Sequence, residues 1–206
     1  MRDRDQAGPA TEQALIERLS RLEDRRAIED VVHRYCRALD RADIALFRSN
    51  FWEDGGFGPG RPTAVARDFA EPLMAAMTAK YAATHHAITT MQVDLRGDRA
   101  SGETYAIVHH RSVPTAAGNA AVLGAAWIDH IDVEAAHDLV IGVRYIDRLE
   151  RRGGEWRIAL RTLIFDWSQV QPSNVRHFGS FTPDTPVGRR GREDLSYGDA
   201  GAASAG

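Results

Sequence analysis

The adjacent histidines His85 and His86, together with Asp40 about 45 residues upstream, are the residues of this chain best suited to acid–base chemistry. A neutral imidazole titrates near neutral pH and can accept a proton from carbon. A carboxylate on its other ring nitrogen fixes the tautomer and stabilises the imidazolium that forms. Asp40 ends a predicted amphipathic helix, where the helix dipole disfavours an anion by ~0.3–1 kcal/mol, so helix stability does not explain it. The spacing therefore predicts a general-base pair, with a solvated helix end as the alternative interpretation of Asp40.

Two pairs of adjacent histidines leave open which member of each pair faces a pocket. Alternation along a strand puts His85 and His86 on opposite faces, and the same holds for His109 and His110. One histidine of each pair is therefore expected to be structural. Adjacent strand histidines diverge too far to share a metal ion, and the sequence has no His-Glu-x-x-His, Cys-x-x-Cys or glycine-rich phosphate motif. We therefore expect no metal and no other cofactor.

The elements that must position Asp40 are helical. Leu15, Leu19 and Leu22 form a short apolar stripe, and a longer stripe at three-four spacing follows it, made of Ile28, Val31, Val32, Tyr35, Cys36 and Leu39. One long helix and two helices divided at Asp24 are both compatible with this pattern. A third helix is expected from about Asp43. Residues 52–62 hold four glycines and two prolines and predict a loop, and residues 64–83 predict another helix.

The period then changes to that of strands. Strand patterns cover residues 86–95, 103–113, 139–150 and 156–167, and Arg152-Gly153-Gly154 predicts a tight hairpin between the last two. Helices followed by strands predict an α+β domain in which helices pack on one side of the sheet. We expect this domain over residues 11–170, after a flexible tail over 1–10 and before a C-terminal extension over 171–206 whose end is disordered.

Composition limits the function classes. The 206 residues are 43% hydrophobic and carry a formal net charge of −3, so neither nucleic acid nor an anionic membrane is an expected partner. Cys36, the only cysteine, excludes an intramolecular disulfide and is expected to be a small buried hydrophobe. No secretory signal or membrane-spanning run is evident, which favours a cytoplasmic protein.

Two groups of residues resemble a known family. The opening segment 22–28 with Tyr35 and Leu39-Asp40, and the closing segment 145–152 with Trp156-Arg157-Ile158 and Arg161, are similar to SnoaL-like proteins of the nuclear transport factor 2-like superfamily. The resemblance covers roughly residues 12–170. It implies a cone-shaped α+β barrel in which N-terminal helices pack against a curved mixed sheet around a deep pocket. The closing Trp-Arg-Ile strand indicates the fold and not the function.

The resemblance also implies roles for four residues. Members similar to scytalone dehydratase and lindane dehydrochlorinase use an aspartate that ends the first long helix and a histidine that opens a strand, and Asp40 and His86 match these positions. His110 matches a second histidine of the dehydratase, and Arg161 matches a last-strand arginine of the dehydrochlorinase. His86 is then the base and Asp40 orients it. His110 would protonate or hold an oxygen, and Arg161 would bind a leaving anion or enolate oxygen.

The chain departs from the dehydratase pattern at two positions. Leu39 replaces the tyrosine expected just before the aspartate, and Phe57 is the aromatic residue nearest to a second missing pocket tyrosine, so scytalone itself is not the expected substrate. The segment 112–138 is long for a strand connection and is a candidate lid or oligomer contact. We expect five side chains to line the pocket, with packing in the core as the alternative role: Tyr35, Phe57, Tyr105, Tyr145 and Trp127.

The function expected from these residues is that of a cofactor-independent lyase of the dehydratase type, acting on a small, largely apolar oxygenated molecule. An isomerase or polyketide-type cyclase would use the same base without expelling a group. A non-catalytic binding or assembly module is the alternative from another class. The resemblance further implies a homo-oligomer, either a trimer or a dimer.

Overall fold

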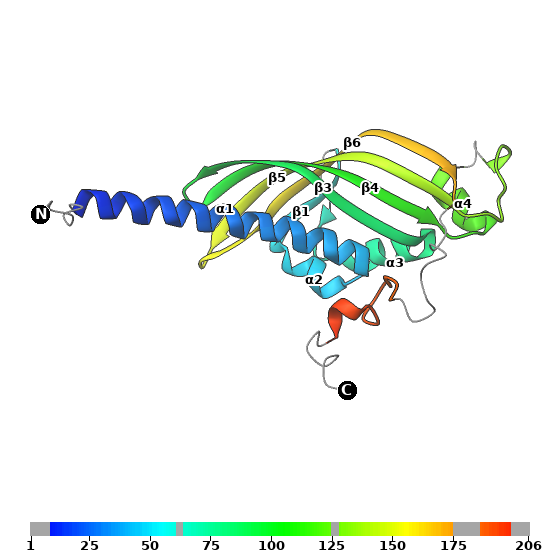
Figure 1. Ribbon diagram of the computed structural model, residues 1–206, viewed down its shortest axis with the longest axis horizontal. Helices are drawn as coiled ribbons and strands as arrows, with labels where there is room; N and C mark the ends of the chain where they lie inside the picture. Colours follow the sequence, from blue (N-terminus) through cyan, green and yellow to red (C-terminus); the bar gives the residue numbers. More distant parts are fainter. Residues whose placement is uncertain (1–8, 61–63, 125–127, 175–185, 199–206) are drawn as a thin grey trace, which may run out of the picture.

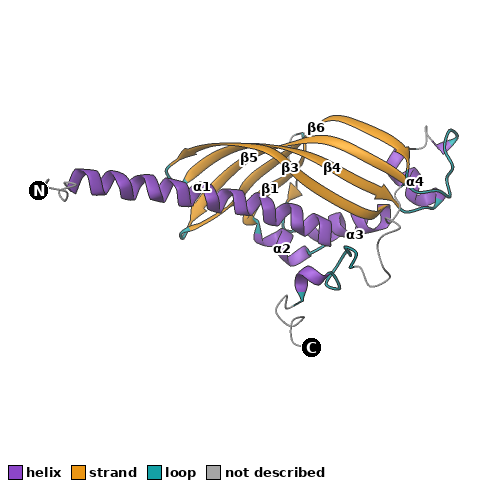
Figure 2. Ribbon diagram, in the orientation of Figure 1, coloured by secondary structure: helices purple, strands orange, loops and turns teal. Residues whose placement is uncertain are grey.

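The computed structural model describes residues 9–60, 64–124, 128–174 and 186–198. Three helices lie along one face of a long curved sheet, and a fourth lies at one end of it (Figures 1 and 2). The helices are α1 (Pro9–Arg41), α2 (Ile44–Ser49), α3 (Ala70–Lys80) and α4 (Ala116–Leu123), with a short 3-10 turn η1 (Leu195–Tyr197) near the C-terminus. No helix in these residues has the length and apolar character that crossing a membrane requires.

The sheet is mixed and open. Its order is β2-β1-β6-β5-β4-β3, and only the β1–β6 pair is parallel. The strands are β1 (Phe51–Pro59), β2 (Ala64–Val65), β3 (Tyr81–Arg96), β4 (Arg99–Ser112), β5 (His137–Arg152) and β6 (Glu155–Pro172). The predicted α+β fold with helices packed on a curved mixed sheet is thus confirmed, although in the described residues β2 and β3 remain edges and no barrel closes. Gly153 and Gly154, with φ of 60° and 87°, form the predicted β5–β6 hairpin.

The N-terminal stripes belong to one continuous helix, α1, which begins at Pro9. Asp24, considered as a cap between two helices, instead accepts hydrogen bonds at 2.7 Å from both Arg151 Nη1 and Trp156 Nε1. Asp24 and Trp156 are both buried. The carboxylate therefore joins the middle of α1 to the β5–β6 hairpin rather than ending a helix. Asp43 does cap the next helix, because its side chain accepts from Leu46 N at 2.9 Å.

Two predictions for residues 52–83 are wrong in detail. The expected loop over 52–62 contains strand β1, which reaches from Phe51 to Pro59. A Cβ at Gly55 would lie 2.9–3.0 Å from two backbone oxygens, so the glycine allows a close approach of chains within the sheet. The expected helix over 64–83 is divided between β2, α3 and the start of β3, and α3 supplies only Ala70–Lys80.

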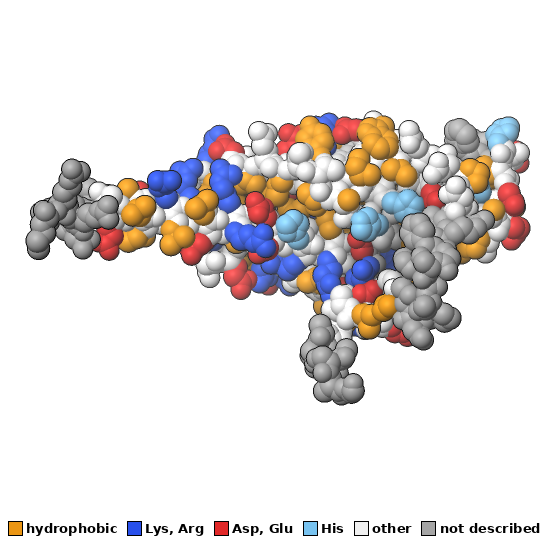
Figure 3. Space-filling model, viewed as in Figure 1, with side chains coloured by type: hydrophobic (Ala, Val, Ile, Leu, Met, Phe, Trp, Pro, Cys, Tyr) orange, Lys and Arg blue, Asp and Glu red, His pale blue; other side chains and the backbone are white. Residues whose placement is uncertain are grey.

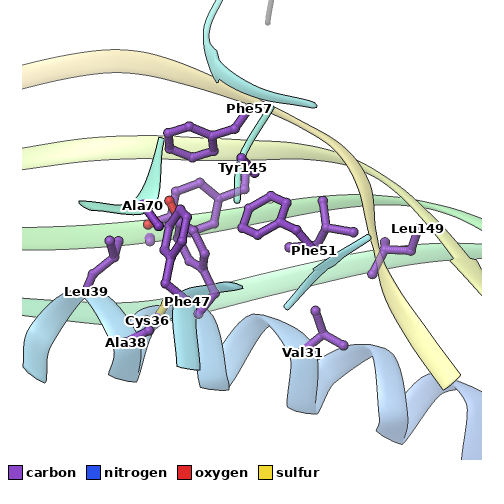
Figure 4. Packing of buried hydrophobic residues seen from close by; sticks show 14 of the residues in the cluster. Val31, Cys36, Ala38, Leu39, Phe47, Phe51, Phe57, Ala70, Tyr145 and Leu149 are labelled. Carbon is purple, nitrogen blue, oxygen red and sulfur yellow. The ribbon is translucent and has the colours of Figure 1, made fainter. Parts of the chain in front are cut away.

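Aromatic side chains fill the space between α1, α2 and the sheet (Figure 4). The ring of Tyr35 lies 5.5–6.4 Å from the rings of Phe47, Phe51, Phe57 and Tyr145, measured between centroids. Cys36 is buried beside them as a free thiol, as predicted. This cluster holds the second half of α1 rigidly against β1, β5 and β6, and so fixes where the helix ends.

The described part of the C-terminal extension returns to the junction of α1, α2 and α3 (Figure 1). Arg190 donates through Nη1 to Met77 O at 3.3 Å and Tyr81 O at 2.9 Å, and through Nη2 to Leu39 O at 3.4 Å. Tyr197 OH donates to Asp43 Oδ2 at 2.7 Å. Residues 186–198 thus cover the C-terminal ends of α1 and α3 of their own chain, and the last residues, 199–206, lie outside the described residues.

Candidate functional site

Asp40 and His86 form a two-point contact at the end of α1. Asp40 Oδ1 lies 2.6 Å from His86 Nδ1, and Asp40 Oδ2 accepts from the His86 backbone N–H at 3.0 Å. The His86 side chain is 5% exposed and that of Asp40 12% exposed, so little water competes with the contact. The aromatic cluster fixes Asp40 from the helix side, and the β3–β4 pairing of His86 with Val108 fixes the ring from the sheet side.

The contact determines which ring nitrogen of His86 is available. Burial raises the pKa of the Asp40 carboxyl, but the hydrogen bonds that it accepts from the ring and the backbone of His86 outweigh burial and bring the pKa below its ordinary value. Asp40 is therefore an anion at neutral pH, and an anion accepts the proton that Nδ1 carries. Nε2 then has a free lone pair. The arrangement is that of an oriented base.

A cavity of about 230 Å³ lies beside this pair, and His86 forms part of its wall. This volume is slightly below the ~300 Å³ lower end of common ligand pockets and suits a small molecule. The wall is mostly apolar, with side chains from α1, α3 and every long strand; its members include Leu39, Leu73, Ala76, Met77, Val108, Ile141, Val143, Leu163 and Phe165. Few polar groups converge in it, as expected of a site that orients a largely apolar substrate.

His110 lies next to His86 in the cavity wall. The two ring centroids are 5.6 Å apart, and the ring of Tyr81 packs against His110 at 4.1 Å with a tilt of 36°. His110 is 8% exposed, and neither of its ring nitrogens has a hydrogen-bond partner among the described residues. Burial, with the nearby His86, lowers the pKa of His110 to about 3. A neutral imidazole can offer an N–H or a lone pair, which suits the second of the two roles expected of His110, that of holding a substrate oxygen.

Arg161 does not contact the cavity, and its expected role at a substrate oxygen is corrected. Its side chain is fully buried and donates through Nε and Nη2 to both oxygens of Asp147, at 2.7 and 2.6 Å. The guanidinium also lies 4.0 Å from the Tyr35 ring centroid and 4.5 Å from that of Tyr145. The strand pattern left open whether Arg161 points inward or is a charge at the sheet edge, and the Asp147 partner on the neighbouring strand was not predicted. Arg161 therefore holds two wall tyrosines in place from behind.

The other predicted pocket residues divide into three groups. Tyr35, Phe57 and Tyr145 line the cavity. Burial raises the pKa of Tyr35 and of Tyr145 above the ordinary value, so both stay hydroxyl donors. Tyr105 does not line the cavity, because the pleat of β4 turns it to the outer face, where it is 44% exposed beside Arg144. Trp127 lies outside the described residues.

The structure also settles which histidine of each pair faces inward. His85 is exposed on the opposite side of β3 from His86, and His109 lies beside Asp138, with Nε2 at 3.1 Å from Oδ1. The 112–138 segment is anchored by buried Asn119 of α4, which accepts from Ser112 Oγ at 2.6 Å and donates to Val133 O and Ala135 O. Among the described residues no group of three or more His, Cys, Asp or Glu side chains is placed to hold a metal ion.

Lys80 and Tyr81, which connect α3 to β3, are among the wall residues that sequence reasoning missed, and they are the polar ones. Lys80 is the only lysine of the chain; the other residues of the 26 Lys and Arg are arginines. Its spacing of seven from Leu73 and three from Met77 was a usable signal, because these positions share one helix face. Tyr81 was hidden by the wrong boundary between the predicted helix and the following strand.

Comparison with known proteins gives a family and a set of similar folds. The model of the SnoaL-like domain family matches residues 20–162. No curated protein matches the chain. The solved structure of a hexachlorocyclohexane dehydrochlorinase from Novosphingobium barchaimii has a TM-score of 0.59 at 20% identity, over 78% of this chain and 97% of that chain.

Two further structures, both from Novosphingobium aromaticivorans, are similar to the same degree. A scytalone dehydratase-like protein has a TM-score of 0.56 at 19% identity and covers 76% of this chain and 91% of its own. A nuclear transport factor 2-like protein with a cystatin-like fold has a TM-score of 0.55 at 21% identity, with coverage of 79% and 92%. At these identities the likeness concerns the fold.

Proposed function

This chain belongs to the SnoaL-like domain family, and from that premise we propose that it is a cofactor-independent lyase of the dehydratase type. The family predicted from the opening and closing motifs is confirmed by the match over residues 20–162 and by the nuclear transport factor 2-like fold. The observation that carries the proposal is the two-point contact of Asp40 with His86 at the wall of a mostly apolar cavity.

The proposed reaction begins at His86 Nε2. This nitrogen takes a proton from a carbon next to an electron-withdrawing group, and the electron pair of the C–H bond forms the new double bond. Asp40 stabilises the imidazolium that results, because the carboxylate is already in contact with Nδ1. The C–O bond on the neighbouring carbon breaks, and the imidazolium returns its proton to the departing oxygen, so water leaves and the base is restored.

His110 supplies a polar contact and no net charge. A buried donor or acceptor without a partner costs about 1–3 kcal/mol, and a substrate oxygen that met the free ring nitrogen would remove this cost. Since the ring is 5.6 Å from that of His86, one small molecule can touch both. We propose that His110 donates a hydrogen bond to the substrate oxygen on which negative charge develops. Tyr35 and Tyr145 complete the wall around this oxygen.

Substitution of His86 tests the proposal. Wild-type protein, His86→Gln and the matched control His85→Gln would be incubated in D₂O with a panel of small β-hydroxy ketones, esters and acids, and the masses of the products would be measured by mass spectrometry. We expect loss of one water with wild type and with the control, and a rate lower by about 10²–10⁴ with His86→Gln. The folded state of each variant is checked by circular dichroism. A folded His86→Gln protein that dehydrates as fast as wild type refutes the assignment.

The same experiment distinguishes the second candidate function, that of an isomerase or cyclase, from that of a lyase. An isomerase or cyclase would use Nε2 to form an enolate and would incorporate deuterium without loss of water. It is retained because the elimination and the isomerisation share the same base, Asp40–His86. A binding or assembly module would show neither deuterium incorporation nor loss of water.

We also propose that the protein forms a homo-oligomer, a dimer or a trimer. Two regions of the surface carry large apolar side chains without a partner in the described residues. One is the projecting end of α1, with Leu15, Ile16, Leu19 and Leu22; the other is the outer face of the sheet, with Tyr105, Ile107 and Trp167. Hydrophobic side chains of the projecting helix are visible in Figure 3. Apolar patches of this kind mark association surfaces.

A further inference from the structure

Lys80 differs in its placement from the arginines of the described residues, none of which lines the cavity. It is the only lysine, and it forms part of the cavity wall at the last residue of α3. Leu73, Ala76 and Met77 line the cavity from the same helix, so the inward face of α3 is apolar until Lys80. The ring of the next residue, Tyr81, packs against His110, so this end of the helix lies close to a site histidine.

The usual role of a lysine at a helix C-terminus is already filled in α3 by another basic residue. A basic side chain there neutralises the last carbonyls and the helix dipole. Arg190 does this for α3, because it donates to the carbonyl oxygens of Met77 and Tyr81. Lys80 is partly buried, and no carboxylate oxygen of the described residues lies within 4.0 Å of its amine. A partly buried ammonium without a carboxylate is uncommon, since lysine is rarely buried unless it is paired.

The choice of lysine over arginine fits the small cavity. An ammonium on a thin four-carbon stem places a compact charge where a planar guanidinium would occupy more of the volume. The Asp40 carboxylate is already bound to His86 at two points, so it is not free to pair with Lys80. A cation in a mostly apolar wall, to which the described residues bring no carboxylate, is complemented by an anion from solution.

We propose that Lys80 binds a carboxylate of the substrate, so that the substrate of this site is a small organic acid with an apolar body. The inference rests on the proposed function in that the same cavity receives the substrate. The Lys80 ammonium pairs with the carboxylate at the α3 end, the apolar wall covers the body, and the carbon to be deprotonated is directed to His86 Nε2.

The unique lysine allows a direct test on the whole protein. Reductive methylation with ¹³C-formaldehyde labels the Lys80 amine and the N-terminal amine, keeps both positive charges, and gives two resolvable NMR signals. Cinnamate and cinnamamide are matched probes that share a shape and differ in charge. We expect cinnamate to move the Lys80 signal and cinnamamide to leave it unchanged. Calorimetry on unlabelled protein should show preference for the carboxylate.

Three variants complete the design. Lys80→Met removes the charge at similar length and should raise the Kd of cinnamate about tenfold, with the Kd of cinnamamide changed less than about twofold. Lys80→Arg keeps the charge and should retain at least part of the preference. The His86→Gln variant should keep the carboxylate preference in full, which separates failure of the anion site from failure of the base.

Two results would overturn the inference. One is a wild-type protein without preference for the carboxylate, including one in which neither probe moves the Lys80 signal. The other is a Lys80→Met protein that loses both probes equally, because this would show that the lysine only shapes the wall. An intact carboxylate preference with no turnover of any hydroxy acid would instead contradict the lyase proposal and leave the anion site standing.

Discussion

Asp40 restrains His86 through both its backbone and its ring. A carboxylate that bonded only to Nδ1 would leave the imidazole free to tilt about that bond, whereas the second bond, from the His86 N–H at 3.0 Å, ties the carboxylate to the strand itself. The ring, the strand and the end of α1 then move together. Such preorganisation lowers the cost of reaching the reactive geometry.

This restraint makes the tautomer of His86 a measurable quantity. We expect long-range ¹H–¹⁵N spectra at pH 8 to show His86 with the proton on Nδ1 and the lone pair on Nε2. Asp40→Asn should shift the population toward the other tautomer, because an amide can turn its NH₂ group to Nδ1. His85, exposed on the opposite face of the strand, is the internal reference. A wild-type spectrum with the proton on Nε2 would contradict the proposed base.

His110 should make stability depend on pH. Burial lowers its folded-state pKa to about 3, against about 6.5 in the unfolded chain, so the unfolded state binds the proton more tightly. Its contribution is complete above pH 6.5 and is lost as the pH falls toward 3. Between pH 7 and pH 5 the free energy of unfolding should fall about 2 kcal/mol more in wild type than in His110→Leu. Urea titrations at the two pH values measure this, and parallel losses in both proteins would contradict it.

At the scale of elements, α1 is joined to the hairpin of β5 and β6 by one carboxylate. Asp24→Ala would leave the Trp156 N–H buried without an acceptor and remove one partner of Arg151. We expect a loss of about 2–3 kcal/mol in the free energy of unfolding. The exposed neighbour Glu23→Ala should change it by less than about 0.5 kcal/mol. Urea unfolding with an unchanged m-value gives the comparison, and equal effects of the two substitutions would show that the buried contact contributes nothing.

The sequence predicted those elements whose pattern is local. The amphipathic run that ends at Asp40 and the four later strand patterns carry their own periodicity, and the structure contains each of them. Strand β1 was missed because its glycines and proline indicate a turn locally. It is a strand because β6 offers it a parallel partner, with Phe57 paired to Arg161, and this information lies about a hundred residues away.

The candidate site was predicted in the same uneven way. Asp40 was marked by a predicted helix end, whereas His86 was chosen over His85 through the family resemblance, and in the structure it lies within β3, which already begins at Tyr81. The isolation of Arg161 from the cavity depends on Asp147 in the adjacent strand, a register that the sequence does not reveal. Lys80 shares a helix face with Leu73 and Met77, but it could be recognised as a wall residue only once α3 was known to end there.

At the scale of the whole molecule, α1 extends beyond the sheet at its N-terminal end (Figure 1). There the side chains of Leu15, Leu19 and Leu22 are 56%, 57% and 65% exposed. A monomeric protein rarely leaves several leucines of one helix face open to water. A homo-oligomer that covers them explains their exposure. The expected oligomer is a multiple of the 22.7 kDa chain mass.

Light scattering after size exclusion tests this surface. Leu19→Glu should lower the measured mass toward that of one chain, because a carboxylate buried in an apolar contact is costly. Ser20→Glu adds the same charge about a quarter turn around the helix and should leave the mass unchanged. A wild-type protein that elutes at one chain mass would contradict the oligomer, and an unaffected Leu19→Glu mass would place the contact elsewhere, at the outer sheet face.

The parallel pairing of β1 with β6 has a consequence for how the chain matures during synthesis. Phe51 pairs with Ile158, which lies 107 positions later. At about 5–20 residues per second, the ribosome needs on the order of 5–20 seconds to supply this partner after β1 has been made. During that interval α1, α2 and the Phe51 and Phe57 rings have only part of their sheet. The glycines of β1 give this segment a low strand propensity of its own. It therefore has little tendency to pair with a wrong strand before β6 has been synthesised.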